Sequence, residues 1–368
     1  VGNTNSAATQ FNWLQDDTVP TMVITASQGA DGFTSKDAAL SLTFTSSEAT
    51  TNFAVGDISV SNCALSAFSV TSTTVYTATC TATADGATTI DVGAGGFTDA
   101  AGNSNTAATQ FNWLQDDTGP TMTITASQGA DGLTSNDAAL TLTFTSNEAT
   151  ATFAVGDISV SNCALSDFAV TSTTVYTATC TATADGATTI DVGAGGFTDA
   201  LGNTNTAATQ FNWLQDDTVP TMTITASQGA DGFTSNDAAL SLTFTSNEAT
   251  SNFAVGDISV SNGAISSFAA TSTTVYTATF TPTADGATTI DVGATYTDAA
   301  GNANTAATQF NWVQDDTKPT MTITAAQGAD GLTSNDAALT LTFTSSEATA
   351  TFAVGDISVS NCALSDFA

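Results

Sequence analysis

The chain has 368 residues and carries 35 acidic side chains against two lysines, with no arginine and no histidine, so its formal net charge is −33 at pH 7. So few cations cannot neutralise a phosphate backbone or an anionic lipid surface, which excludes nucleic-acid binding and electrostatic attachment to membranes. The apolar runs are only a few residues long, far below the roughly 20 residues that span a bilayer, so direct membrane insertion is excluded too, and no signal peptide is visible.

The chain is a tandem repeat. Its tryptophans, at positions 13, 113, 213 and 312, lie in close copies of the stretch FNWLQDDT and are 100, 100 and 99 residues apart. This spacing predicts the last strand of a preceding repeat at 1–17, complete repeats at 18–117, 118–217 and 218–316, and the first part of another repeat at 317–368. About 100 residues can enclose a hydrophobic core, so each complete repeat is expected to fold as a domain. Because both ends fall inside a repeat, we expect the natural chain to be longer.

Within one repeat, apolar residues alternate with threonine and serine, as in AALTLTFTS at 138–146. Alternation with period two is typical of half-buried strands, and no helical periodicity competes with it. In the second repeat it predicts strands at 120–126, 138–145, 157–162, 164–170, 174–183, 187–193 and 205–214. About seven short strands in 100 residues predict an all-β fold, a tandem array of immunoglobulin-like, seven-stranded antiparallel β-sandwich domains. The tryptophans alternate with phenylalanine on the last strand, and we interpret them as core residues in preference to platforms for carbohydrate.

The stretches TFTSNEATATFAVGDISVSN and YTATCTATADGATTIDVGAGGFTDALGNTNTAA, followed by DDTVPT, resemble the bacterial Ig-like (Big) tandem repeats of large extracellular adhesins and surface proteins. The resemblance covers essentially the whole chain. It implies the β-sandwich fold and an extracellular or cell-surface location. Adhesins with similar repeats commonly hold calcium where domains meet, so the resemblance also implies calcium at the repeat junctions.

The five cysteines follow the repeat. Cys63 and Cys80 recur as Cys163 and Cys180, whereas the third repeat has glycine and phenylalanine at the matching positions 263 and 280. Two residues that disappear together indicate a disulfide, so we predict the pairs Cys63–Cys80 and Cys163–Cys180. Buried free thiols are the alternative. Stable disulfides indicate an oxidising, extracellular compartment.

Acidic residues recur at three places that alternating strand directions would bring to one end of each domain: the linker before the first strand, the loop after the second, and the loop after the sixth. Carboxylates converging without a cation repel one another, and hard oxygen donors without histidine or thiolate suit Ca²⁺. A solvated acidic linker is the alternative, and an additional strand in FAVGDIS would move Asp57 and its copies to the other end. The predicted calcium ligands are Asp16, Asp17, Glu48, Asp57, Asp99, Asn103, Asp116, Asp117, Glu148, Asp157, Asp199, Asn203, Asp216, Asp217, Glu248, Asp257, Asp298, Asn302, Asp315, Asp316, Glu347 and Asp356.

Two further aspartates, Asp31 and Asp85, precede glycines at the opposite end of the first repeat. We interpret them as ordinary Asp-Gly turn residues, with a contribution to the metal site of the next repeat as the alternative.

Catalysis is not expected, because the chain has no histidine to act as a base and its aspartate pairs recur in every repeat. The function predicted is a non-enzymatic, calcium-rigidified rod or stalk of a large surface adhesin. The alternative is a repeat subunit of a self-assembling extracellular filament, sheath or fibre. The expected partners are the neighbouring repeats of the same chain, and either other copies of the chain or a distal adhesion head.

Overall fold

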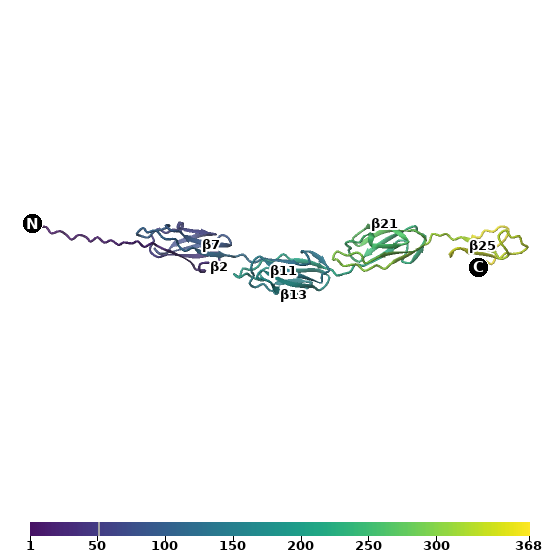
Figure 1. The fold of residues 1–368 in the computed structure, drawn as a ribbon, viewed down its shortest axis with the longest axis horizontal. Helices are drawn as coiled ribbons and strands as arrows, with labels where there is room; N and C mark the ends of the chain where they lie inside the picture. The colour runs from purple at the N-terminus through teal and green to yellow at the C-terminus, as the bar shows by residue number, and fades with distance from the viewer. Residues whose placement is uncertain (51) are drawn as a thin grey trace. The chain divides into compact units, whose positions relative to one another are not determined.

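The computed structural model of the chain describes residues 1–50 and 52–368. The chain divides into two units, residues 1–216 and 217–368, and each is described by itself. The first unit holds two complete repeats, and the second holds one complete repeat followed by a smaller segment (Figure 1). Residues 1–20 form no strand and lead into the first repeat as an extended segment.

Every complete repeat has the same order of elements. The first contains β1 (Met22–Ala26), β2 (Phe33–Ser35), β3 (Ala39–Ser46), the 3-10 turn η1 (Val55–Asp57), β4 (Ile58–Ser61), β5 (Cys63–Val70), β6 (Val75–Ala82), β7 (Gly86–Val92) and β8 (Phe111–Gln115). The second contains β9 (Met122–Ala126), β10 (Leu133–Ser135), β11 (Ala139–Ser146), η2 (Val155–Asp157), β12 (Ile158–Ser161), β13 (Cys163–Val170), β14 (Val175–Ala182), β15 (Gly186–Val192) and β16 (Phe211–Gln215).

The second unit repeats this order. It contains β17 (Met222–Ala226), β18 (Phe233–Ser235), β19 (Leu240–Ser246), η3 (Val255–Asp257), β20 (Ile258–Ser261), β21 (Gly263–Ala270), β22 (Val275–Pro282), β23 (Gly286–Val292) and β24 (Phe310–Gln314). The segment beyond it contains β25 (Met321–Ala325), β26 (Leu341–Ser345) and η4 (Val354–Asp356).

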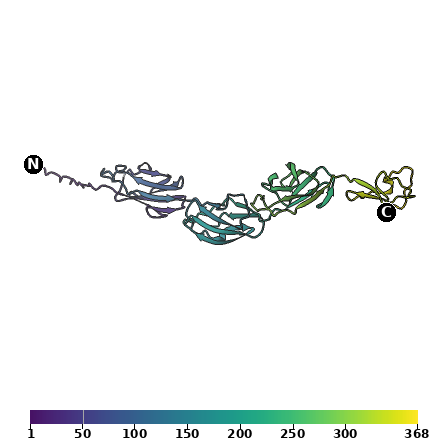
Figure 2. The same cartoon turned by 45° about the vertical axis from the view of Figure 1, so that its right-hand side comes forward.

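Two four-stranded sheets form each complete repeat. In the first repeat the strand orders are β1-β3-β6-β5 and β2-β8-β7-β4. A second view shows strands of both sheets packed against each other within each repeat (Figure 2). The alternation of buried and exposed residues along β3 and β6 directs one face of each strand into the core between the sheets. This confirms the all-β, immunoglobulin-like sandwich predicted from the alternation.

The structure differs from the prediction by one additional short strand, which lies in the stretch expected to be the loop after the first strand. In the second repeat β9 pairs antiparallel with β11, whereas β10 pairs parallel with β16 in the other sheet. Gly132, with φ of +81°, lies just before β10, where the chain crosses between the sheets. Each complete repeat therefore has eight strands, and one pairing in each is parallel.

The core of the first repeat confirms the interpretation of the tryptophans. Trp113 is 1% exposed and stacks on Phe33, with ring centroids 6.3 Å apart. Its indole N–H donates to the Ser35 hydroxyl at 3.1 Å, so the polar edge of the ring has a partner inside the core. Phe111 is buried beside it on the same strand. The earlier copy, Trp13, is 76% exposed because residues 1–20 lie outside any sheet.

The structure joins both predicted cysteine pairs. Cys63 bonds to Cys80, and Cys163 bonds to Cys180, each across 17 residues of sequence. Cys80 is fully buried, as predicted for the inward face of its strand. In the third repeat a Cβ added to Gly263 would lie 2.3 Å from the Phe280 ring, so this ring occupies the space that the sulfurs fill in the other repeats.

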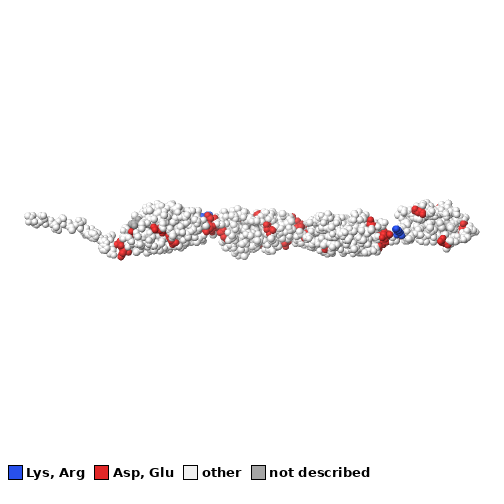
Figure 3. All heavy atoms as spheres, turned by 90° about the horizontal axis from the view of Figure 1, so that it is seen from above, with Lys and Arg blue, Asp and Glu red and all other residues white. Residues whose placement is uncertain are grey.

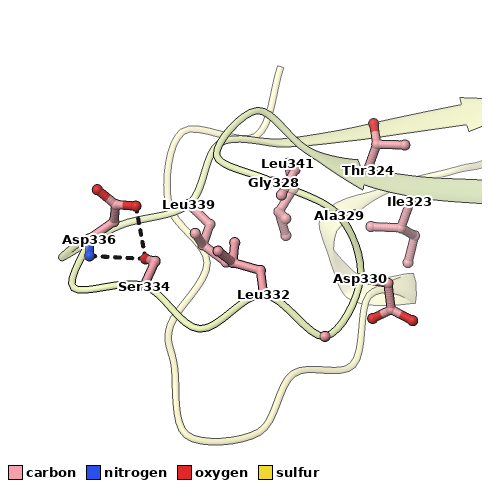
Figure 4. Close-up of a pocket in the computed structure, with 12 residues that line it drawn as sticks. Ile323, Thr324, Gly328, Ala329, Asp330, Leu332, Ser334, Asp336, Leu339 and Leu341 are labelled. Atoms are coloured by element: carbon pink, nitrogen blue, oxygen red, sulfur yellow. Dashed lines mark hydrogen bonds between the residues drawn. The ribbon is translucent and has the colours of Figure 1, made fainter.

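The segment 317–368 carries a groove of about 1110 Å³ lined by residues of β25 and of the stretch up to β26 (Figure 4). Ile323 and Leu339 on this groove are 59% and 48% exposed, whereas their counterparts Ile224 and Leu240 are 7% and 0% exposed. In the complete repeat before it, strands β22 to β24 complete the sheets around the matching residues. The groove is therefore the uncovered inner surface of a sandwich and does not indicate a ligand pocket.

Candidate metal centre at the start of each repeat

Three segments far apart in sequence bring carboxylates together at one end of the first repeat. Asp16 precedes β1, Glu48 follows β3, and Asp99 follows β7. Each offers an oxygen, and these oxygens all lie within 4.8 Å of one another. The same grouping recurs in the second repeat with Asp116, Glu148 and Asp199. The convergence of the linker with the two loops agrees with the prediction from strand direction.

The loop that carries Asp99 is held in place by its own hydrogen bonds. One carboxylate oxygen of Asp99 accepts the backbone N–H of Asn103 at 2.8 Å, and the other accepts the Asn103 side-chain amide at 2.9 Å. The same amide donates to the backbone carbonyl of Asp16 at 3.1 Å. Asn103 therefore braces the linker against the loop, and Asn203 makes the same contacts with Asp199 and Asp116.

In these groups Glu48 and Glu148 each have one side-chain oxygen that lacks a hydrogen-bond partner. One carboxylate oxygen of each, Oε1, is buried and has no hydrogen-bond partner. Burial raises the pKa of Glu148, and the charges of Asp116, Asp199 and Asp85 raise it further. Burial followed by the charges of Asp16 and Asp99 raises the pKa of Glu48 in the same way. A buried acceptor surrounded by negative charge favours a cation as its partner.

The pKa of the buried aspartate in each of the two groups shifts in the opposite direction, below its usual value. Asp99 and Asp199 are 4% and 5% exposed, and burial alone would raise the pKa of each. Hydrogen bonds from the side chain and backbone of Asn103 and Asn203 outweigh that effect, so the pKa of both aspartates lies below its usual value. Each group thus combines an aspartate held ionised with a glutamate for which ionisation is costly.

Other predicted ligands lie in different surroundings. Asp57 closes the 3-10 turn η1, where its carboxylate accepts the N–H of Ala54 at 2.8 Å. Among the described residues, the close carboxylate group of the first repeat includes neither Asp57 nor Asp17. Asp157 accepts the N–H of Ala154 in the same way. Whether these aspartates contribute ligands stays a prediction.

In the second unit, Glu248 and Asp298 occupy the loops that carry Glu148 and Asp199 in the second repeat. Asp298 is 3% exposed and accepts the backbone N–H of Asn302 at 2.8 Å, so its loop has the same internal brace. In the segment 317–368, Glu347 also has a buried oxygen without a partner. The remaining predicted ligands of this unit, Asp217, Asp257, Asp315, Asp316 and Asp356, stay predictions.

The structure gives Asp85 a role that the turn interpretation missed. Its carboxylate accepts the backbone N–H of Asp117 at 3.0 Å and the hydroxyl of Thr118. The hydroxyl of Thr118, followed by the N–H of Asp117, keeps the pKa of Asp85 low. Asp285 holds Asp316 and Thr317 in the same way within the second unit. The turn between β6 and β7, which separates the fifth and sixth predicted strands, therefore fastens the linker that leaves the repeat. In the sequence, DG recurs 31, 31 and 30 residues before the second, third and fourth copies of DDT, and this recurrence was the available signal.

The donor set of the carboxylate groups fits a hard divalent cation. It consists of oxygens, and neither thiolates nor imidazoles belong to it. Ca²⁺ takes six to eight oxygen ligands in flexible geometry, and it accepts carboxylates together with backbone carbonyls and water. In this structure the Oε1 atom of Glu148 is buried and has no hydrogen-bond partner, and a bound cation would provide one.

Comparison with solved structures finds chains of related fold. The chain is similar to invasin, a bacterial integrin-binding protein, with 17% identity and a TM-score of 0.34 over 84% of this chain and 62% of that one. It is also similar to InvD of Yersinia pseudotuberculosis, with 13% identity and a TM-score of 0.32 over 77% of this chain and 86% of that one. For the S-layer protein rSbsC the identity is 13% and the TM-score 0.19, over 90% of this chain and 63% of that one.

These similarities concern the fold alone, and the chain spans about 62% of the invasin structure. Comparison with curated proteins finds no match. In the part of the chain that the structure describes, no helix has the length and apolar character needed to cross a membrane. A family model for the bacterial Ig-like domain matches residues 16–114, 116–214 and 216–313. These three consecutive matches cover most of the 368 residues and confirm the resemblance seen in the sequence, so the chain belongs to the bacterial Ig-like domain family.

Proposed function

We propose that this chain is a non-enzymatic, extracellular stalk region of a large surface adhesin, in which Ca²⁺ stiffens the junctions between repeats. Membership of a family of tandem Ig-like domains supports a structural role. The two disulfides support an oxidising, extracellular location. The carboxylate groups at the start of the first and second repeats support a bound cation at each of these two places.

The observation that carries the calcium proposal is the environment of Glu148. A glutamate with a buried, unpartnered oxygen and three carboxylates raising its pKa is unfavourable as a free anion. A divalent cation would supply the missing partner and neutralise the group at once. Because Asp116 belongs to the linker while Glu148 and Asp199 belong to the repeat that follows, the ion would fasten the linker to that repeat.

The stiffening follows from the two attachments of the linker. Asp85 holds Asp117 and Thr118 on the side of the preceding repeat. The ion would hold Asp116 on the side of the next repeat. The linker is then held at both of its ends, and it finishes at Pro120, whose ring restricts the backbone. Its backbone therefore has few accessible conformations. Without the ion, the carboxylates repel one another and the second attachment is weakened.

The test is calcium titration of the whole chain by calorimetry together with small-angle scattering. We expect binding of about one ion per complete repeat, and a larger maximum dimension with calcium than with a chelator, because a stiff array is more extended than a jointed one. Magnesium serves as the matched control, since its smaller shell demands near-octahedral geometry and several waters. Absence of calcium binding, or scattering curves that coincide with and without the chelator, would contradict the proposal.

One observation favours self-assembly as a second candidate function. The strands of the sheet β1-β3-β6-β5 contain no charged residue, although the chain carries a net charge of −33. Red acidic patches and broad uncharged stretches are both visible on the surface of the repeats (Figure 3). An uncharged sheet face is the surface through which two such acidic chains could approach laterally. Negative-stain images distinguish the candidates: isolated thin particles support a stalk, and ordered multi-chain assemblies support a filament.

A further inference from the structure

We infer that the junction between repeats 18–117 and 118–217 is an interdomain staple, fastened by Lys36 and fitted by Gly119, that holds without a bound ion. This inference rests on the proposed stalk function for its meaning, and it makes one joint of the array different from the others. It is carried by contacts within the first unit and by a comparison of the repeats with one another.

The fastening contact is made by one of the two lysines of the chain. The Lys36 ammonium donates to the backbone carbonyl of Gly202 at 3.1 Å, across 166 residues of sequence. Lys36 follows β2 in the first repeat, while Gly202 lies in the loop of the second repeat that also carries Asp199 and Asn203. The other repeats have asparagine at the position of Lys36, at 136, 236 and 335. An asparagine side chain is two bonds shorter and uncharged, so it cannot make this contact from the same backbone position.

The linker is adapted to the same loop. A Cβ added to Gly119 would lie 1.9 Å from the backbone carbonyl oxygen of Thr204, so any larger residue would force the linker away. The other linkers have Val19, Val219 and Lys318 at this position. The linkers before Pro20 and Pro120 make the same backbone contact with their loops, so what is particular to this junction is the backbone path at Gly119, which leaves no room for a side chain.

The differences between the first two repeats cluster at this contact. Those repeats differ at about a dozen positions. Two of these, Lys36 against Asn136 and Val19 against Gly119, make the contacts described above, and two more, Ala101 against Leu201 and Ser104 against Thr204, lie in the loop that is contacted. Leu201 and Thr204 belong to the loop that receives Lys36 and faces Gly119. Unrelated drift would scatter such differences over the repeat. Their gathering in and against one loop of the second repeat, the loop that Lys36 of the first repeat reaches, indicates a joint with its own chemistry.

Together with Asp85, these residues hold the linker from both repeats. Asp85 binds Asp117 and Thr118 on the side of the first repeat, and Lys36 ties the first repeat to the loop of the second. The ammonium is a cation fixed to the protein, so this attachment persists when divalent ions are removed. The stapled pair of repeats would act as one longer rigid segment, followed by a junction that has asparagine and valine instead.

The chain provides a matched control for the experiment, because FNWLQDDT is identical at 111–118 and 211–218. A protease that cleaves before aspartate therefore meets the same sequence in both linkers, and the difference in cleavage rate reports accessibility. The whole chain is digested in a chelator, and fragments are followed by mass spectrometry. We expect the linker at Asp116 and Asp117 to be cut about fivefold more slowly than the linker at Asp216 and Asp217, since the net contribution of one solvent-exposed hydrogen bond corresponds to about this factor.

Two sets of variants test the assignment of the staple. Lys36→Asn combined with Gly119→Val should make the two rates equal, and Asn136→Lys combined with Val219→Gly should slow cleavage of the second linker. Equal rates in the unchanged chain, or a slow first linker that survives Lys36→Asn, would overturn the inference. A parallel digestion in calcium separates this inference from the proposed function: if both rates are unaffected by calcium while their ratio is kept, the staple stands and the calcium joint fails.

Discussion

Replacing Glu48, Glu148 and Glu248 by glutamine is expected to raise the melting temperature of the chain in a chelator and to lower it in millimolar calcium. Without an ion, the substitution removes a charge whose burial and acidic neighbours raise the pKa of Glu48 and Glu148, so the folded state gains. With calcium, it removes a charged ligand. A ligand at 100 times its Kd stabilises by about 2.7 kcal/mol, so calcium should raise the melting temperature of the unchanged chain by about 10 °C, and the variant should lose most of this gain.

The matched control replaces Asp91, Asp191 and Asp291 by asparagine. These aspartates lie on β7, β15 and β23, so the control removes the same number of charges away from the carboxylate groups. It should shift the melting temperature by similar amounts in both solutions. If the glutamine variant changes the melting temperature in the same direction with and without calcium, the carboxylate groups do not bind the ion.

Acidification in the chelator should act like the glutamine substitution. The folded state takes up protons on Glu48 and Glu148 at a higher pH than the unfolded state, since their pKa is raised above 4.5. Stability should therefore increase as the pH falls through the raised pKa towards 4.5. Below about 3.8 the lowered pKa of Asp99 and Asp199 acts in the opposite direction, and stability should be lost again. Calcium should abolish the increase, because protons and the ion compete for the same oxygens.

Reduction of the disulfides is expected to destabilise the first two repeats by about 3 kcal/mol each and to leave the third unchanged. Each bridge closes 17 residues, and a loop of this size restricts the unfolded chain by about that amount. The third repeat has Gly263 and Phe280 in place of the bridge and serves as an internal control. Hydrogen exchange followed by mass spectrometry, before and after a phosphine reductant, resolves the repeats from one another.

A transplant tests whether the phenylalanine replaces the bridge. In the first repeat, Cys63→Gly with Cys80→Phe should retain more stability than Cys63→Ser with Cys80→Ser, because the ring fills the fully buried space that serine leaves. The exchange protection of the first repeat reports both variants. If both variants lose the same amount of stability, or if reduction destabilises all three repeats equally, the phenylalanine ring does not take the place of the disulfide in the core.

Much of the fold could be predicted because its signals are local. The alternation in β3 and β6 follows directly from serine or threonine at every second position, and the joint loss of both cysteines in the third repeat identified the bridge. The short strand β10 was missed for a physical reason. Three residues are too few to show alternation, and the strand exists because Leu133 pairs with Trp213, about 80 residues away.

The candidate metal centre could be predicted only in part. Strand directions were enough to bring Asp16, Glu48 and Asp99 to one end. They could not show that Asp57 turns its carboxylate back to the N–H of Ala54, since that depends on the 3-10 turn between them. The contact between Asp85 and the linker could not be predicted for a similar reason. An aspartate before glycine is already explained by a turn, and its hydrogen bond with Thr118 is seen only when the position of the linker is known.

The parallel pairing of β2 with β8 has a mechanical consequence. β2 follows the first strand of the repeat and β8 is its last strand, so tension along the chain pulls the two strands in opposite directions. The hydrogen bonds between Phe33–Ser35 and Trp113–Gln115 are then loaded side by side in shear, and several must break together before the sandwich opens. We expect single-molecule pulling to show a high rupture force that falls when Ser35→Pro removes a donor from this ladder, because the backbone of Ser35 faces β8 and accepts the N–H of Asp116. A repeat that resists stretching at this point suits a molecule under drag from flowing liquid.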